Sequence, residues 1–201
     1  MQKLKELFLS ELLLKSRNTQ KIAYVGVMSA LLVVCNMFFE FKLAETQFSL
    51  TIFFSALSGI IVGPLFGFLV SFLGDFVGFL YNSGGYPFMP WIGIAMGVTA
   101  FIFGFIFNGI KLNFEGEEYV KVGEEYVKVT VCCILSFLAC TVLINTTAFW
   151  VVYNLMKTPY IEYLFTRIFL QGQIFNSLFN FGLIYAFVPI FNKLKKILIK
   201  S

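Results

Sequence analysis

Long apolar stretches alternate with short polar segments along this chain. A transmembrane α-helix needs about 20 mostly apolar residues, and each stretch is close to that length or exceeds it. Six such stretches are present, over residues 21–39, 47–63, 65–81, 91–110, 130–152 and 163–190. The pattern predicts an all-α integral membrane protein with six transmembrane helices.

Polar segments at the two ends divide the chain into three parts. Residues 1–20 combine Lys, Glu and Arg with Leu at helical spacing, which predicts an amphipathic segment on the cytoplasmic surface of the membrane. A helix surrounded by water would show the same pattern, so both interpretations stay open. Residues 21–190 form the predicted six-helix membrane domain, and residues 191–201 form a basic cytoplasmic tail.

The distribution of Lys and Arg predicts the orientation, because cytoplasmic loops carry an excess of these residues. With the N-terminus inside, twelve of the 15 Lys and Arg residues fall in inside segments. Only Lys42 and Lys157 fall in outside loops, and Arg167 lies within the last apolar stretch. Both termini are therefore predicted to be cytoplasmic.

Composition excludes a soluble domain and several kinds of chemistry. The chain is 59% hydrophobic and 13% charged, with a mean hydropathy of +0.85, whereas a soluble fold carries about 25% charged residues. It has no His, a single Asp (Asp75) and no phosphate-binding loop of the G-x-x-x-x-G-K-[ST] type. We expect no enzyme activity, no cofactor or metal, and no nucleic-acid partner.

Small residues predict where helices approach closely, since association in lipid depends on tight packing. Gly63 and Pro64 separate the second and third stretches and predict a tight hairpin. Gly67 follows Gly63 by four residues and extends the small-residue spacing into the third stretch. Ala23, Gly26 and Ala30 form a narrow small-residue stripe on the first helix. The stripe can serve packing within the chain or contact with a partner.

Charged side chains inside a membrane are costly and mark a bundle interior or a cavity. Asp75 lies mid-way along the third stretch, where we expect a structural hydrogen-bond acceptor. Arg167 shares a helical face with Gln171 near the outer end of the sixth stretch, which favours an anionic ligand there. Pairing of Arg167 with Asp75, Glu162 or a carbonyl group is the alternative.

Aromatic and amide side chains near the predicted outer surface suggest the rest of a binding site. A Gly/Pro-rich loop carries Tyr86, Phe88 and Trp91, whose rings can stack on a flat ligand. The fifth stretch adds Asn145, Thr146 and Trp150, and the loop residue Lys42 adds a second cation. This combination fits a planar heteroaromatic acid that binds from outside.

The same regions resemble the substrate-binding S components of energy-coupling factor (ECF) vitamin transporters, and the folate branch in particular. The resemblance rests on residues 56–67, 74–75, 84–90, 143–146, 157–160, 166–168 and 173–176. It implies a six-helix S-component fold in a bacterial cell membrane and high-affinity capture of folate or a reduced folate from outside. It also implies docking onto a transmembrane coupling subunit with two cytoplasmic ATPases, through the stripe that contains Gly26 and Ala30.

Two other functions remain open. The loop Tyr86-Pro87-Phe88-Met89-Pro90 departs from the pattern that we expect of the folate branch, which leaves an S component for a different vitamin as an alternative. A stand-alone secondary carrier of a small aromatic acid would usually show inverted halves with matching broken helices, and the sequence shows none.

Overall fold

The computed structural model describes residues 8–43, 46–81, 87–109, 118–154 and 156–200. For Glu11, 40–48, Gly109, 118–122 and 191–200 it describes the backbone alone. The elements in chain order are α2 (Glu11–Lys15), α3 (Asn18–Phe38), β1 (Glu40–Leu43), β2 (Thr46–Ser49), α4 (Thr51–Val62), α5 (Pro64–Tyr81), α6 (Pro90–Gly109), α7 (Glu118–Ser136), η1 (Phe137–Thr146), α8 (Thr147–Val152), α9 (Tyr160–Phe165), η2 (Thr166–Leu170) and α10 (Gln173–Lys200). The segments η1 and η2 are π-helical.

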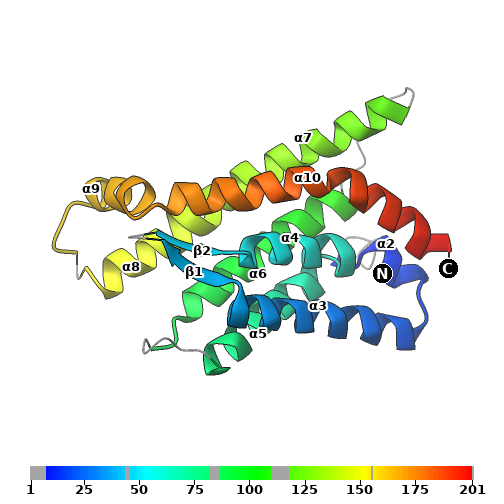
Figure 1. Ribbon diagram of the computed structural model, residues 1–201, viewed down its shortest axis with the longest axis horizontal. Helices are drawn as coiled ribbons and strands as arrows, with labels where there is room; N and C mark the ends of the chain where they lie inside the picture. The colour runs from blue at the N-terminus through cyan, green and yellow to red at the C-terminus, as the bar shows by residue number, and fades with distance from the viewer. Residues whose placement is uncertain (1–7, 44–45, 82–86, 110–117, 155, 201) are drawn as a thin grey trace.

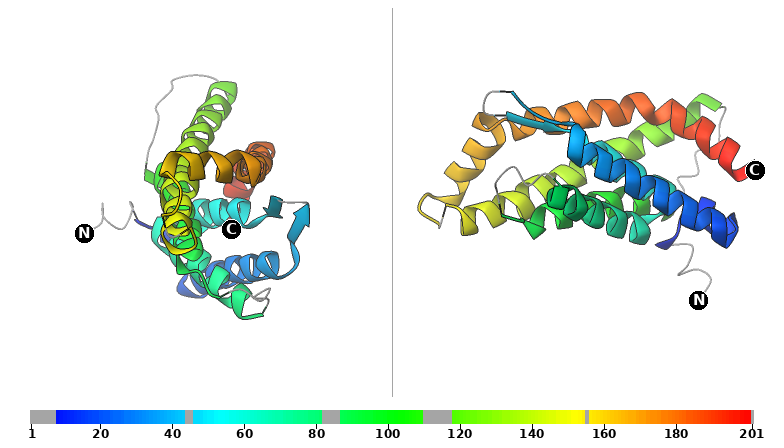
Figure 2. Two further views of the ribbon diagram at one scale, coloured as in Figure 1. Left: turned by 90° about the vertical axis from the view of Figure 1, so that its left-hand side faces the viewer. Right: turned by 60° about the horizontal axis from the view of Figure 1, so that its bottom comes forward.

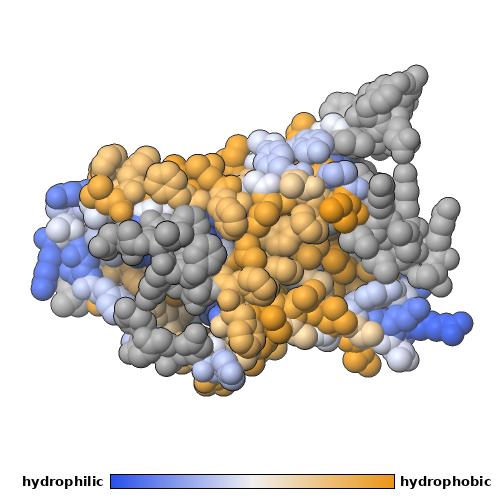
Figure 3. Space-filling model, in the orientation of Figure 1, coloured by the Kyte–Doolittle hydropathy of each residue, from blue (hydrophilic) through white to orange (hydrophobic). Residues whose placement is uncertain are grey.

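The long helices run side by side along the longest axis of the molecule (Figure 1). One end of this bundle carries α2 and the last turns of α10, and we call it the terminal end. The opposite end carries β1, β2, α8 and α9, and we call it the hairpin end. A broad hydrophobic band covers the middle of the bundle, and hydrophilic residues gather towards its ends (Figure 3). This distribution is the one that a bilayer-spanning protein requires.

Within the described residues, five helical segments are long and apolar enough to cross a membrane: Asn18–Phe38, Pro64–Tyr81, Pro90–Asn108, Gly123–Val152 and Gln173–Ile190. The prediction of six full-length spans is thus met in part, because the second apolar stretch yields only the 12-residue helix α4. At 1.5 Å per residue α4 is about 18 Å long, short of a hydrocarbon core of about 30 Å. The cytoplasmic location of the termini stays a prediction.

The first part of the second stretch is a strand rather than a helix. Residues Glu40–Leu43 and Thr46–Ser49 pair as an antiparallel hairpin, which the hydrophobic pattern did not predict. Two asparagines of α10 hydrogen bond to the backbone where the hairpin joins α4. Asn176 Oδ1 accepts from the Ser49 amide at 3.1 Å, and Asn180 Oδ1 accepts from the Phe53 amide at 3.0 Å. The polar side chains of Asn176 and Asn180 on α10 therefore stabilise the fold.

The sixth predicted span, 163–190, is broken. Gly172 adopts a φ of 69°, a left-handed conformation that glycine tolerates and that ends a helix. Arg167 and Gln171 therefore precede the break, in and just after η2, while Asn176 and Asn180 follow it in α10. Figure 2 shows α9 and η2 running at an angle to α10 at the hairpin end. The expectation that these residues share one straight helix was wrong.

Small residues bring α4, α5 and α6 into backbone contact, as their spacing predicts. A Cβ added at Gly59 would overlap the carbonyl oxygen of Ala100, and one added at Gly67 would lie 2.7 Å from the Gly59 Cα. Gly63 has a φ of 93°, and Pro64 begins α5 immediately after it. The Gly63-Pro64 turn is therefore the sharp connection between α4 and α5 that the sequence predicts.

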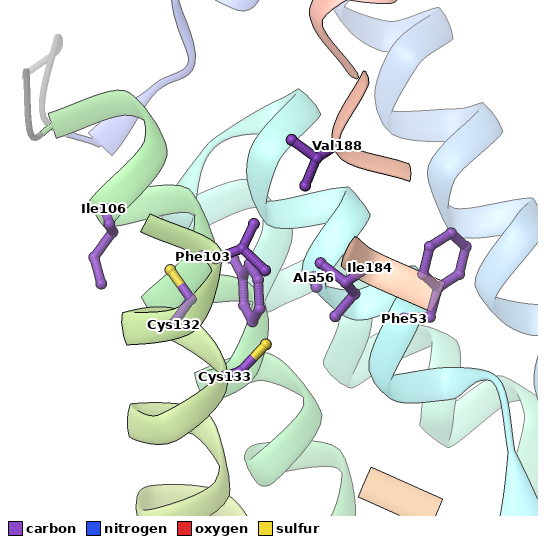
Figure 4. Packing of buried hydrophobic residues seen from close by; sticks show 9 residues of the cluster. Phe53, Ala56, Phe103, Ile106, Cys132, Cys133, Ile184 and Val188 are labelled. Carbon is purple, nitrogen blue, oxygen red and sulfur yellow. The ribbon is translucent and has the colours of Figure 1, made fainter. Parts of the chain in front are cut away.

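Two apolar clusters fill the bundle towards the terminal end. The larger one joins α4, α6, α7 and α10 through Phe53, Phe103, Cys133 and Ile184, among others (Figure 4). The smaller one includes Leu13 of α2, which is 1% exposed. Leu13 of the N-terminal segment thus packs on protein, and the position of the segment on the membrane surface stays a prediction.

Candidate functional site

An arginine and three aromatic rings meet near the hairpin end. The ring centroid of Phe149 lies 5.7 Å from that of Trp91 and 5.5 Å from that of Tyr153, and the guanidinium carbon of Arg167 lies 3.8 Å from it. These residues come from α6, α8, the end of α8 and η2. We call Trp91, Phe149, Tyr153 and Arg167 the Phe149 cluster.

Arg167 is buried in this cluster without a counter-charge. Its side chain is 9% exposed, and its Nε has no hydrogen-bond partner. Tyr163, one turn earlier, lies next to the guanidinium, but no ion pair joins Arg167 to a carboxylate in the described ranges. Stacking on Phe149 offsets part of the desolvation cost, by about 0.5–2 kcal/mol. A buried cation in this state is suited to an anionic ligand.

A small cavity of about 20 Å³, with room for roughly one water molecule, lies between α4, α6, η1 and α10, and we call it the bundle cavity. Its walls are mostly apolar and include Ile52, Ala95, Met96, Phe137 and Phe181. Its polar groups come from Thr99, Ser136, Thr141 and Asn145, together with the thiol of Cys140.

The π-helical segment η1 supplies one side of this cavity. Phe137, Cys140, Thr141 and Asn145 all belong to it. Long π-helical runs are rare in proteins and occur frequently at functional sites. Asn145 lies about one turn before Phe149 in the same continuous helix, so η1 and α8 connect the bundle cavity with the Phe149 cluster.

Buried polar atoms without partners concentrate in these two regions. Among the described side chains such atoms are Ser55 Oγ, Trp91 Nε1, Ser136 Oγ, Asn145 Oδ1 and Arg167 Nε. All except Ser55 belong to the cavity wall or to the Phe149 cluster. An unpaired buried polar atom costs about 1–3 kcal/mol, so this concentration indicates polar groups that bound water or a ligand completes.

The structure brings together two of the predicted ligand-binding residues, Trp91 and Arg167, which both contact the Phe149 ring. A third, Asn145, lies in the wall of the bundle cavity. Two other predicted residues, Thr146 and Trp150, form contacts within the protein. Thr146 is fully buried, and its hydroxyl donates to the Thr141 carbonyl at 2.7 Å. Trp150 donates from Nε1 to the Thr158 carbonyl at 2.9 Å and packs on Tyr160. Both side chains therefore stabilise the helices around the site.

The remaining predicted positions lie outside this group. Phe88 packs on Phe76 and Phe79 of α5, and Gln171 is partly exposed at the end of η2. The Lys42 side chain and the whole of Tyr86 lie outside the described residues, so their ligand contacts stay predictions. Asp75 lies against α6, where a Cβ added at Gly93 would be 3.1 Å from its Oδ2.

Comparison with known proteins identifies the family. The profile described as ECF-type riboflavin transporter, S component, matches residues 16–196. The chain belongs to this S-component family. Among solved structures, the crystal structure of FolT bound with folic acid aligns with a TM-score of 0.64 at 18% identity, over 88% of this chain and 95% of that chain. This likeness confirms the S-component fold. No curated protein sequence matches significantly.

Membership of this family makes the chain a vitamin-binding membrane subunit of a transporter. The small-residue stripe on α3 is compatible with a partner contact, because Ala23, Gly26 and Ala30 are all exposed. A Cβ added at Gly26 would meet no atom within 4 Å. The stripe is therefore open to lipid or to a partner, and its role in docking stays a prediction.

Several residues of the site were not predicted. Phe149 is one of 27 Phe residues, and nothing in its sequence context distinguishes it. Ser136 and Thr99 are isolated polar residues in apolar stretches, and this feature of the sequence could have identified them. In the described part of the chain, no group of three His, Cys, Asp or Glu residues could hold a metal ion.

Proposed function

We propose that this S component binds folate, or a reduced folate, from the outside of a bacterial cell with high affinity. The observation that carries the proposal is the buried guanidinium of Arg167 in the Phe149 cluster, whose Nε has no hydrogen-bond partner and which forms no ion pair with a carboxylate of the described residues. Folates combine a flat heteroaromatic ring with carboxylates. The ring fits among aromatic and amide side chains, and a carboxylate pairs with a guanidinium through two parallel hydrogen bonds.

The similarity to FolT supports this choice by fold, since that protein was crystallised with folic acid. With the termini inside, the hairpin end faces outwards and the Phe149 cluster lies near the external entrance. Ligand would then enter from outside.

Riboflavin is the second candidate, because the matching family profile is described by that vitamin. Riboflavin also has a flat ring system with polar groups along its edge, but it carries no carboxylate. It would leave Arg167 without a counter-charge. Folate binding would therefore depend on the Arg167 cation, whereas riboflavin binding would not.

For transport, the subunit would deliver its ligand by docking onto a transmembrane coupling subunit that is driven by two ATPases. The exposed stripe of Ala23, Gly26 and Ala30 supports this part of the proposal, because close helix contact in lipid requires small side chains. A stand-alone carrier would need no such face.

The experiment is a binding titration of the purified protein with folic acid and with riboflavin, each with the wild type and with Arg167→Ala. Tight binding of folic acid that Arg167→Ala weakens supports the folate assignment. Preferential binding of riboflavin, unaffected by Arg167→Ala, would replace it with the second candidate. Failure of the wild type to bind either vitamin would overturn the proposed function.

A further inference from the structure

The bundle cavity has the size and the polarity of a site for one water molecule. Its volume of about 20 Å³ fits a single water and is too small for an organic ligand. Ser136 and Asn145 both line it, and Ser136 Oγ and Asn145 Oδ1 are buried without hydrogen-bond partners. Apolar cavities stay dry, whereas an internal water is held by about two to four polar partners. These two side chains supply the first two.

The hydrogen-bonding chemistry of the cavity wall also suits water. An amide oxygen only accepts hydrogen bonds, while a hydroxyl both donates and accepts. A water can therefore donate to Asn145 Oδ1 and accept from Ser136 Oγ at the same time. Thr99 lines the same cavity, and its hydroxyl donates to the Ala95 carbonyl at 3.0 Å. The Thr99 oxygen is thus left to accept the second proton of the water.

The π-helical winding of η1 brings the two unpaired atoms to one wall. Ser136 directly precedes η1 and Asn145 lies in its last turn, nine positions later. In an α-helix, with about 3.6 residues per turn, nine positions make about two and a half turns and would place the side chains on opposite sides. In a π-helix, whose i→i+5 bonds give roughly 4.4 residues per turn, nine positions make about two turns. Ser136 and Asn145 then face the same way.

The other residues that η1 contributes to the wall follow the same winding. Phe137, Cys140 and Thr141 lie between Ser136 and Asn145 in the sequence and all line the cavity. Their spacing of four to five residues is the spacing of a π-helix rather than of an α-helix. The cavity wall and the π-helical form of η1 therefore depend on each other.

We propose that the bundle cavity binds one structural water, which bridges Ser136 Oγ and Asn145 Oδ1 and holds η1 in its π-helical form. Helix α8 continues from η1 without a break, so the angle at which η1 winds also sets the direction of Phe149. Through Phe149 the water positions the contacts with Trp91 and Arg167. This role does not depend on which vitamin the subunit binds.

The first test compares Ser136→Ala with Ser55→Ala in thermal unfolding of the ligand-free protein in detergent. Ser55 on α4 is the matched control, because it is 0% exposed and its Oγ has no partner, but it does not line the cavity. Both positions are helical, so the gain in helix propensity is similar. Ser136→Ala should lower the midpoint by about 2–4 °C through the lost hydrogen bond to water, whereas Ser55→Ala should keep or raise it. An equal or raised midpoint in both variants would overturn the proposal.

A second variant and a direct observation complete the test. Asn145→Leu has a similar volume but no acceptor, so it should lower the midpoint if water is bound and keep or raise it if the cavity is dry. A high-resolution crystal structure of the wild type should show a water within hydrogen-bond distance of Ser136 Oγ and Asn145 Oδ1. A cavity without such a water would overturn the proposal.

The positioning role has its own readout, the fluorescence of Trp91 in the ligand-free Trp150→Phe protein. In this background Ser136→Ala should shift the emission maximum, because Phe149 turns relative to Trp91, and Ser55→Ala should not. Unchanged emission in a Ser136→Ala protein with a lowered midpoint would overturn the coupling from the water to Phe149. None of these measurements uses a vitamin, so failure of the proposed function and failure of this inference are distinguishable.

Discussion

The guanidinium carbon of Arg167 lies 3.8 Å from the centre of the Phe149 ring, so the cation is stacked on an aromatic face. Trp91 packs edge-on against the same ring, with centroids 5.7 Å apart and an interplanar angle of 81°. Phe149 therefore fixes the positions of both a cation and an indole. Each of these two groups also has a buried nitrogen without a partner, which makes the cluster an incomplete polar site.

Replacing Arg167 by Ala should weaken folic acid binding by about 2–4 kcal/mol, because a buried carboxylate loses its charged partner. Binding of 6-hydroxymethylpterin, which has no carboxylate, should change little. Isothermal titration of both ligands measures the difference. Arg17 at the start of α3 is exposed and provides the matched control, so Arg17→Ala should bind both ligands normally. Unchanged folic acid affinity in a folded Arg167→Ala protein would show that the cation does not contact ligand.

The two tryptophans should respond differently to ligand. Trp91 has an unpaired Nε1 in the Phe149 cluster, whereas Trp150 is hydrogen bonded to the Thr158 carbonyl. Folic acid should therefore quench the fluorescence of Trp150→Phe, in which only Trp91 remains, more strongly than that of Trp91→Phe. Replacing Trp91 by Ala should also weaken binding by about 1–3 kcal/mol if its ring stacks on the ligand. Equal quenching in both single-tryptophan proteins would remove Trp91 from the site.

Polar residues in the apolar stretches were the part of the site that the sequence revealed. Arg167 was predicted because a charge within a membrane span needs a partner, Asn145 because an amide can contact a heterocycle, and Trp91 because its ring can stack on a flat ligand. The structure leaves each of the three with an unpaired atom. Phe149 could not be predicted, because its role depends on which residues approach it from η2 and α6. Hydrophobic periodicity contains no information on such contacts.

The fold was predictable where small residues carry the information. The interval from Gly59 to Gly67 predicted the close contact of α4 and α5, and Gly63-Pro64 predicted the turn between them. The break at Gly172 was missed because apolar residues continue on both sides of it. Strand β2 was missed for a related reason, since a short apolar run before α4 fits a helix and a strand equally well.

Close packing between α4 and α6 gives a stability prediction. Replacing Gly59 by Ala places a methyl group on the Ala100 carbonyl, and overpacking of this kind costs about 1–3 kcal/mol or more. Gly182 on α10 is the control, because a Cβ there would meet nothing within 4 Å. Thermal unfolding in detergent should show a lower midpoint for Gly59→Ala and an equal or higher one for Gly182→Ala. Equal midpoints would mean that α4 and α6 separate without cost.

Asp75 should prove structural. Its carboxylate lies beside Gly93 on α6, and Asp75 is not among the residues that line the bundle cavity. Asp75→Asn keeps the shape and one carbonyl acceptor, so folic acid affinity should stay within about threefold, or roughly 0.7 kcal/mol. Asp75→Leu should instead lower the unfolding midpoint, because the polar groups around it lose their acceptor. A selective loss of binding in the Asn variant, with normal stability, would place Asp75 in the ligand site.

The stripe on α3 allows docking to be separated from ligand binding. Ala23 and Gly26 lie in the half of α3 near the terminal end, and Ala30 lies just past its middle; all three are exposed. The Phe149 cluster lies near the hairpin end. A large side chain at Gly26 has room in the isolated subunit, since nothing lies within 4 Å of an added Cβ. Gly26→Trp should therefore leave the folding and the folic acid affinity of the isolated subunit unchanged.

In the assembled transporter the same side chain would hold a partner helix away from α3. We expect Gly26→Trp to abolish ATP-dependent uptake into liposomes and co-purification of the coupling subunit. Gly182→Trp is the matched control, because Gly182 is equally open but lies on α10. It should dock and transport like the wild type if α3 alone provides the contact. If Gly26→Trp still transports while Gly182→Trp does not, the coupling subunit approaches α10 and the stripe on α3 faces lipid.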